Sequence, residues 1–117
     1  MDNIYNVTVQ ASDGELTVTQ DIAVTVTALN DNNPVITSNG LLSIAENTTA
    51  VITVTATDAD LPAQALTYSI AGGADSALFS INSFTGDLAF INAPNYEVPI
   101  DAGIDNIYNV TVQASDG

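Results

Sequence analysis

Most of this chain alternates apolar and polar residues with a period of two. Val, Ile and Thr dominate these stretches, for example at 16–19 (LTVT) and 22–27 (IAVTVT). Such alternation puts apolar side chains on one face of an extended strand, and β-branched residues are enriched in strands. No segment has a convincing helical period. We therefore expect an all-β fold with strands at 4–11, 16–28, 35–45, 49–57, 65–70, 78–82, 87–91 and 106–114.

One segment of thirteen residues, DNIYNVTVQASDG, occurs twice, at 2–14 and 105–117. Chance does not produce an identical repeat of this length, so it indicates either tandem repetition or an engineered overlap. The two copies begin about 100 residues apart, which is the usual length of one β-sandwich module. We interpret them as the same strand in two successive modules.

The chain has 14 acidic residues and no Lys, Arg, His or Cys, which gives a formal net charge of -14. Because side-chain ion pairs are excluded, we expect a divalent cation to neutralise part of this charge. Nucleic acid and anionic membrane surfaces are excluded as partners, since both require Lys or Arg. No apolar run approaches the length of a membrane span, so we expect no direct membrane insertion. The regular pattern of hydrophobic residues argues against disorder.

The acidic residues fall mainly at the ends of the expected strands and in the turns between them. In an up-and-down path of strands, alternate turns lie at opposite ends of a sandwich. The strand order then places Asp58, Asp60 and Asp116 at one end, and Glu46 and Glu97 at the other. Turns are polar in any protein, but carboxylates grouped at each end without a compensating base favour metal binding.

Six short motifs follow one another along the chain: LNDNNPVI (29–36), IAEN (44–47), TATDAD (55–60), FSINSFTGDLAF (79–90), NYE (95–97) and ASDG (11–14 and 114–117). In order and spacing they resemble the motifs D-x-N-D-N-x-P, x-E-N, D-x-D, F-x-I-x-x-x-T-G-x-L, D-x-E and A-x-D-x-G of the cadherin repeat. The resemblance covers the whole chain and is to the tandem form found in large bacterial cell-surface adhesins. It implies an all-β, Greek-key, Ig-like (cadherin-type) β-sandwich of about seven strands.

In cadherin repeats Ca²⁺ binds at the junction between successive repeats, and the resemblance carries this role onto residues of this chain. The ion takes about six to eight hard oxygen ligands, whereas Mg²⁺ demands a tighter octahedron and Zn²⁺ prefers His and Cys. The implied ligands are Asn30, Asp31 and Asn32 of the linker, Asp58, Asp60 and Asp116 of the repeat after it, Glu46 and Glu97 for the junction at that repeat's other end, and Asp13 for the preceding junction.

The chain departs from the family pattern at three places. The leading Asp of the linker motif is Ala28, and the Asp of D-x-E is Asn95. Each change removes a carboxylate, which is expected to weaken or remove one ion. The loop 61–65 is short for the family, and Gln64 is the candidate there for a carbonyl ligand.

The resemblance also predicts how the chain is organised. Residues 1–28 are expected to be the last two strands, F and G, of one repeat, 29–34 a calcium-binding linker, and 35–117 strands A to F of the following repeat. The linker reaches at most about 21 Å, which is too short for strand G to fold back onto that repeat. Strand G of one molecule is therefore hypothesised to complete the sandwich of another, head to tail. The alternative is a monomer with 1–28 packed loosely or unconventionally.

The expected function is a structural extension or adhesion module of a secreted, extracellular cell-surface adhesin, in which Ca²⁺ holds neighbouring cadherin-like repeats in line. The alternative is that the repeat itself contacts a ligand, as a carbohydrate-binding module for a surface polysaccharide or as a homophilic adhesion module. Few aromatic residues are present to support it, and most are expected in the core. An enzyme such as a glycosidase with paired carboxylates is not expected, because the acids are accounted for as ligands.

Overall fold

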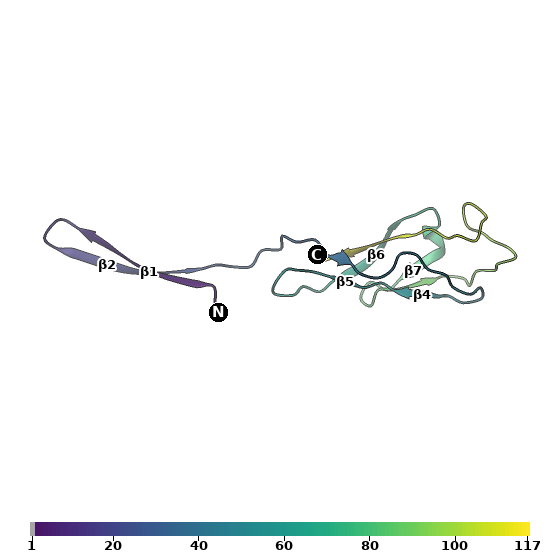
Figure 1. The fold of residues 1–117 in the computed structure, drawn as a ribbon, viewed down its shortest axis with the longest axis horizontal. Coiled ribbons are helices and arrows are strands. Elements are labelled where there is room, and N and C mark those ends of the chain that lie inside the picture. Colours follow the sequence, from purple (N-terminus) through teal and green to yellow (C-terminus); the bar gives the residue numbers. More distant parts are fainter. Residues whose placement is uncertain (1) are drawn as a thin grey trace. The chain divides into compact units, whose positions relative to one another are not determined.

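The computed structural model of the chain describes residues 2–117, which form two units (Figure 1). The first unit ends at Asn30 and the second runs from Asp31 to Gly117. Both are built of strands and loops, which confirms the expected all-β fold. The helical element η1 (Ser76–Leu78) is a single 3-10 turn. Among the described residues, no helix has the length and apolarity needed to cross a membrane.

The first unit is a two-stranded antiparallel hairpin of β1 (Ile4–Ser12) and β2 (Thr17–Thr25). The turn between the strands is specified by local side chains. The Ser12 hydroxyl accepts a hydrogen bond from Gly14 N at 3.1 Å, and Asp13 Oδ1 accepts one from Leu16 N at 2.9 Å. Every residue of both strands is exposed.

The second unit contains three small antiparallel sheets. They pair β3 with β5, β4 with β8 and β8 with β7, and β6 with β9. Strands far apart in the sequence are therefore neighbours, as in a sandwich whose chain crosses between sheets. The strands are β3 (Val35–Ile36), β4 (Ala50–Thr53), β5 (Ala56–Thr57), β6 (Thr67–Gly72), β7 (Phe79–Ile81), β8 (Asp87–Phe90) and β9 (Thr111–Ser115).

A tight turn joins β7 to β8 and is fixed by residues of the motif 79–90. Asn82 Oδ1 accepts hydrogen bonds from Phe84 N at 2.9 Å and Thr85 N at 3.1 Å. Gly86 follows with φ of +80°, and a Cβ at this position would lie 2.3 Å from the carbonyl oxygen of Val54. Only glycine fits there, because the conformation is left-handed and the neighbouring backbone is close.

The core of the second unit is a cluster of four buried side chains: Val54, Phe79, Leu88 and Phe90. Phe79 and Phe90 stack with ring centroids 4.4 Å apart, and Tyr108 meets the edge of Phe90 at 5.1 Å. Val110 and Val112 pack against the same cluster and are partly buried. The core therefore links β4, β7 and β8 to the segment that enters β9.

Two expected strands differ most from the structure, in which each is much shorter than the alternation predicts. The expected strand 35–45 pairs only at β3, because Asn39 Oδ1 accepts the N–H of Leu41 at 2.9 Å and turns the chain out of the ladder. The expected strand 106–114 begins only at β9. The N–H of Asn106 is taken by a carboxylate of Asp101 at 3.0 Å, which holds this stretch in a loop.

Candidate metal centre

Three carboxylates gather at one end of the second unit. Asp58 and Asp60 follow β5 directly, and Asp116 follows β9. Each offers one oxygen to a group in which all such atoms lie within 4.8 Å of one another. In the part of the chain that the structure describes, this is the one group of three or more acidic side chains this close together. The arrangement arises because the ends of two strands that are distant in sequence meet at one edge of the unit.

Asp60, a member of this three-carboxylate cluster, is hydrogen-bonded to Asp31 and Asn32 at the start of the unit. It is buried, with only 4% of its surface exposed. Its Oδ1 accepts a hydrogen bond from Asn32 Nδ2 at 2.7 Å, and its Oδ2 accepts one from Asn32 N at 3.1 Å. Asp31 N also points at Asp60 Oδ1, at 3.5 Å. The expected linker residues Asp31 and Asn32 thus lie beside Asp60 and contact it through their N–H groups.

The pKa values of Asp58 and Asp60, the two carboxylates of the D-x-D motif, are shifted in opposite directions. Hydrogen bonds from the Asn32 side chain and from backbone N–H groups lower the pKa of Asp60. Asp58 Oδ1 accepts the N–H of Asp60 at 2.8 Å, which acts to lower the Asp58 pKa. Burial and the negative charges of Asp116 and Asp60 outweigh that bond, so the pKa of Asp58 is raised. The negative charge of Asp58 is therefore less well compensated than that of Asp60.

One buried oxygen of the cluster has no hydrogen-bond partner among the described residues. Asp58 Oδ2 is buried and accepts no hydrogen bond from any described residue. A buried carboxylate oxygen without a donor is costly in a protein, and the chain has no Lys, Arg or His to pair with it. A hard divalent cation would satisfy this oxygen and neutralise the cluster, so the donor set fits Ca²⁺. Gln64, in the loop after Asp60, also has a buried oxygen (Oε1) without a partner among the described residues.

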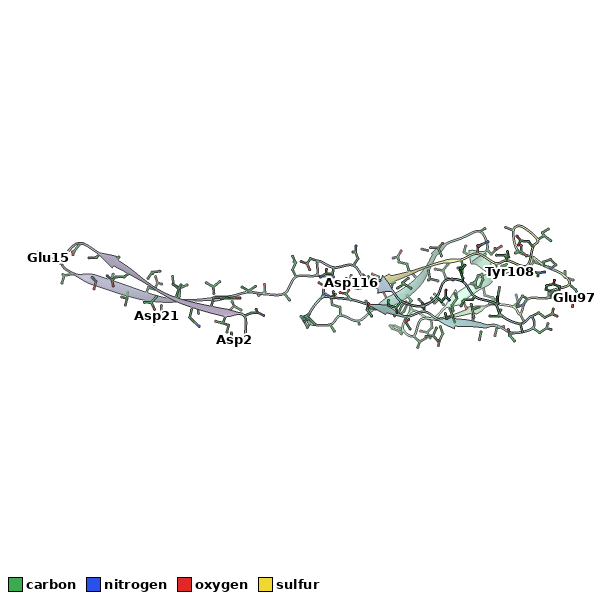
Figure 2. The ribbon with its side chains drawn as sticks, in the orientation of Figure 1. Asp2, Glu15, Asp21, Glu97, Tyr108 and Asp116 are labelled. Atoms are coloured by element: carbon green, nitrogen blue, oxygen red, sulfur yellow. The ribbon has the colours of Figure 1, made fainter. Side chains whose placement is uncertain are left out.

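Glu46 and Glu97 lie at the other end of the second unit, and Figure 2 shows Glu97 and Asp116 at its opposite ends. Glu46 Oε2 accepts the N–H of Tyr96 at 2.7 Å, which places its carboxylate beside the residue that precedes Glu97. The Glu97 side chain is exposed. Two acidic side chains are thus present at this end, and no third joins them within the described residues.

The remaining two predicted ligands, Asp13 and Asn30, belong to the first unit. Asp13 caps the hairpin turn, where its carboxylate accepts N–H groups of Leu16 and Glu15, and these hydrogen bonds lower its pKa. Asn30 is exposed. Asp13 has the same position in the repeated segment as Asp116, but in the hairpin it has only its own turn as a partner.

Sequence reasoning missed two buried acids, Asp75 and Asp101, which hold the loop before β9. Asp75 Oδ1 accepts Ala102 N at 2.7 Å, and its Oδ2 accepts Asn109 N at 2.8 Å. Asp101 accepts Asp105 N at 2.9 Å as well as Asn106 N. Because backbone N–H groups occupy both oxygens of each side chain, these acids serve the fold rather than an ion. Nothing in their spacing along the sequence signalled this role.

Asp101→Asn is expected to destabilise the chain at neutral pH but not in acid. Burial acts to raise the pKa of Asp101, but the N–H groups of Asp105 and Asn106 outweigh it and the pKa is lowered. A carboxylate with a lowered folded-state pKa stabilises the fold above its unfolded pKa of about 3.9, and this contribution is lost as the pH falls through the folded value. Urea unfolding of both proteins at neutral pH and below pH ~3 measures the difference. An equal difference at both pH values would contradict this account.

Known proteins with similar sequences contain cadherin domains. The profile described as "Cadherin domain" matches residues 41–117. Human protocadherin gamma-B4 is 33% identical over 121 residues, covering 97% of this chain and 12% of the relative. Human protocadherin gamma-A2 is 36% identical over 124 residues, covering 97% of this chain and 13% of the relative. Human cadherin EGF LAG seven-pass G-type receptor 2 is 34% identical over 122 residues, which is 98% of this chain and 4% of the relative.

Solved structures agree with the fold. The extracellular domain of protocadherin gammaB4 superposes with a TM-score of 0.66 at 28% identity, covering 98% of this chain and 18% of that one. The EC3-6 cis-dimer structure of protocadherin gammaB7 gives a TM-score of 0.64 at 28% identity, covering 98% and 29%. The chain thus spans between 4% and 13% of the length of the three curated relatives above. The cadherin-type β-sandwich expected from the motifs is confirmed.

Proposed function

The chain belongs to the cadherin family, and on this premise we propose that it is a calcium-binding extension and adhesion module of an extracellular, secreted cell-surface protein. The single observation that carries the calcium role is the buried, unpaired Asp58 Oδ2 within the cluster of Asp58, Asp60 and Asp116. Those three carboxylates, with Asp31 and Asn32 beside Asp60, are the proposed ligands at this end of the second unit. Asn30 is proposed to join them from the linker.

Bound Ca²⁺ would supply the positive charge that the side chains of this chain lack. Three carboxylates repel one another in its absence, and the segment at Asp31 and Asn32 is held to the unit chiefly through Asp60. A cation shared between the cluster and the linker would add attraction there and limit bending between successive repeats. Neighbouring cadherin-like repeats are accordingly the proposed partners of both ends of the module.

Glu46 and Glu97 are proposed to serve the next junction, and Asp13 the preceding one. Glu97 lies at the end of the unit opposite to Asp116 (Figure 2), and Glu46 is beside it through its hydrogen bond from Tyr96 N, as a repeat in the middle of an array requires. Asn95 stands where the family motif has a carboxylate, so this junction has one acidic ligand fewer. We expect it to bind calcium more weakly than the cluster at Asp58.

The domain organisation is part of the same proposal: residues 1–28 as strands F and G of one repeat, 29–34 as the linker, and 35–117 as strands A to F of the next. The exact recurrence of DNIYNVTVQASDG supports tandem repetition. The bacterial adhesin setting of the parent protein rests on the sequence resemblance, since the relatives named above are mammalian. No catalytic role is proposed, because the clustered acids are accounted for as ligands.

A second candidate function, direct contact with a ligand, is favoured by two exposed aromatic residues. Phe84 in the β7–β8 turn is 82% exposed and Tyr96 is 66% exposed. Exposed aromatic rings are typical contacts for the apolar faces of sugars and for partner proteins. Loss of binding to a surface polysaccharide, or to a second cadherin-like repeat, in Phe84→Ala and Tyr96→Ala would support this function over a spacer.

Calcium is expected to raise the thermal unfolding midpoint of the chain. A ligand that binds only the folded state stabilises it by about 2.7 kcal/mol when its free concentration is one hundred times the dissociation constant. Circular dichroism melts in EDTA and in millimolar Ca²⁺ measure the shift. NaCl of equal ionic strength is the control, because any salt screens a net charge of -14. An equal midpoint in the calcium and NaCl samples would refute the proposed calcium role.

A further inference from the structure

Asn39 and Gly40 form the single Asn-Gly pair of the chain. They follow directly on two residues of the second unit that are held against the segment between β4 and β5. Thr37 N donates a hydrogen bond to the carbonyl oxygen of Thr55 at 2.8 Å, and Ser38 Oγ accepts one from Thr55 N at 3.2 Å. Asn39 itself is exposed. The backbone before Asn39 is therefore fixed, while its side chain is accessible to water.

The side-chain amide of Asn39 is held close to the backbone that follows it. Its Oδ1 accepts the N–H of Leu41 at 2.9 Å. This hydrogen bond closes a small ring that contains both Cγ of Asn39 and the backbone nitrogen of Gly40, so the two atoms stay near each other. A donor to Oδ1 also stabilises the negative charge that develops on this oxygen when a nucleophile attacks Cγ, as the donors of an oxyanion hole do. The Leu41 N–H thus activates the amide carbon.

The backbone nitrogen of Gly40 is a suitable nucleophile. In the structure of residues 2–117 its N–H donates no hydrogen bond, because the turn at Asn39 leads the chain out of the ladder with β5. Glycine has no Cβ beside the nitrogen, which leaves the approach to Cγ unhindered. A Cβ built at Gly40 would meet nothing within 4 Å, so no neighbouring group restricts this peptide.

Two other asparagines make the same kind of turn but lack such a nucleophile. Asn95 Oδ1 accepts the N–H of Glu97 at 3.0 Å, but the N–H of the intervening Tyr96 is donated to a carboxylate. Asn82 Oδ1 accepts two N–H groups, but the residue after it is Ser83, whose side chain crowds the nitrogen. Of these three asparagines, only Asn39 combines an activated amide with an unhindered, unbonded nitrogen.

We propose that Asn39 is a site of spontaneous modification, at which the chain converts its own asparagine to aspartate and isoaspartate. The Gly40 nitrogen attacks Cγ and forms a C–N bond. The side-chain NH₂ then leaves as ammonia with the proton from Gly40, and a five-membered succinimide results. Water opens this ring. Cleavage of the new C–N bond gives aspartate, and cleavage of the original peptide bond gives isoaspartate. No oxidant or reductant is needed.

The modification changes both the charge and the backbone at this position. Either product adds one negative charge to a chain whose net charge is already -14. Isoaspartate also inserts a methylene into the main chain. Because Thr37 and Ser38 are held at Thr55, the added length displaces the residues after position 39. The modified fraction increases with the age of the molecule. This reaction goes beyond the proposed function and requires no calcium, so each can fail without the other.

Peptide mapping of the aged chain tests the proposal. The unaltered chain is incubated in mildly alkaline buffer below its thermal midpoint, cleaved after glutamate and analysed by mass spectrometry. Peptide 16–46 contains Asn39, and peptide 47–97 contains Asn95 as the internal control. Aspartate and isoaspartate are expected at position 39, at a rate at least about tenfold above the rate at Asn95. An intact Asn39, or a rate close to that of Asn95, would overturn the proposal.

Gly40→Ala identifies the nucleophile. The added methyl group lies beside the attacking nitrogen and is expected to slow the reaction of Asn39 about tenfold. Gly72→Ala is the matched control and is expected to react like the unaltered chain. At both glycines φ lies outside the left-handed region and a Cβ would meet nothing within 4 Å, so both variants are expected to fold, which circular dichroism checks. Equal rates at Asn39 in the two variants would contradict attack by the Gly40 nitrogen.

Discussion

Asp58→Asn is expected to raise the thermal midpoint of the calcium-free chain and to remove most of the rise that calcium produces. The Asp58 charge is disfavoured in the folded state: the bond from Asp60 N acts to lower its pKa, but burial and the neighbouring carboxylates raise it. Asparagine keeps the oxygen that accepts the N–H of Asp60 and removes the uncompensated charge. It also offers an amide to the carboxylate of Asp116, which lies in the same cluster.

Asp60→Asn is expected to have the opposite effect on the calcium-free chain. Both oxygens of Asp60 accept hydrogen bonds from Asn32, and asparagine presents an N–H₂ group in place of one of them. The calcium-free midpoint should therefore fall, and the calcium response should fall with it. A removed acceptor leaves its donor unsatisfied, which is the costly outcome in a buried network.

Melts of the two variants with and without calcium separate the role of each carboxylate. Glu15→Gln removes one negative charge at an exposed position of the hairpin turn and is the charge-matched control. It is expected to retain the full calcium response. A calcium response in Asp58→Asn equal to that in Glu15→Gln would show that Asp58 is not a ligand. A fall in the calcium-free midpoint of Asp58→Asn would contradict the electrostatic account of the cluster.

Phe90→Ala is expected to lower the free energy of unfolding of the second unit by about 3–5 kcal/mol, the usual cost of removing a buried phenylalanine. Phe90 is 8% exposed and lies between Phe79 and Tyr108, so the substitution removes two aromatic contacts as well as buried area. The buried apolar core has only four members among the described residues. A domain of this kind is stable by about 5–15 kcal/mol in total, so the variant should be close to unfolding.

Phe84→Ala is the matched control, since Phe84 is the most exposed aromatic side chain of the second unit. It is expected to change the free energy of unfolding by less than about 0.5 kcal/mol. Urea denaturation followed by tyrosine fluorescence measures both variants, because the chain has no Trp. Similar losses in the two variants would mean that the core is not organised around Phe90.

The sequence allowed the strands with the clearest alternation to be predicted well. The strands expected at 4–11 and 87–91 lie close to β1 and β8. The expected strand 35–45 was wrong beyond Ile36, because the Asn39 side chain takes a backbone N–H that a ladder would need. Alternation indicates which residues suit a strand. It does not indicate where a side chain forms a local hydrogen bond to the backbone that competes with strand pairing.

The grouping of Asp58, Asp60 and Asp116 could also be predicted, because strand ends at one edge of a sandwich meet in space. That these residues bind an ion stays a prediction. The burial of Asp75 and Asp101 could not be foreseen, since nothing in their spacing distinguishes an acid that binds backbone N–H groups from one that faces solvent. The opposite pKa shifts of Asp58 and Asp60 likewise depend on contacts with Asn32 that only the folded chain defines.

Isothermal titration of Ca²⁺ into the metal-free chain tests the central claim most directly. The account predicts saturable binding by the unaltered chain and by Glu15→Gln, much weaker binding by Asp116→Asn, and a preference for Ca²⁺ over Mg²⁺ because the site is assembled from flexible oxygen ligands. Absence of saturable heat in the unaltered chain, or equal calcium affinity in Asp116→Asn and Glu15→Gln, would contradict a calcium site built from Asp58, Asp60 and Asp116.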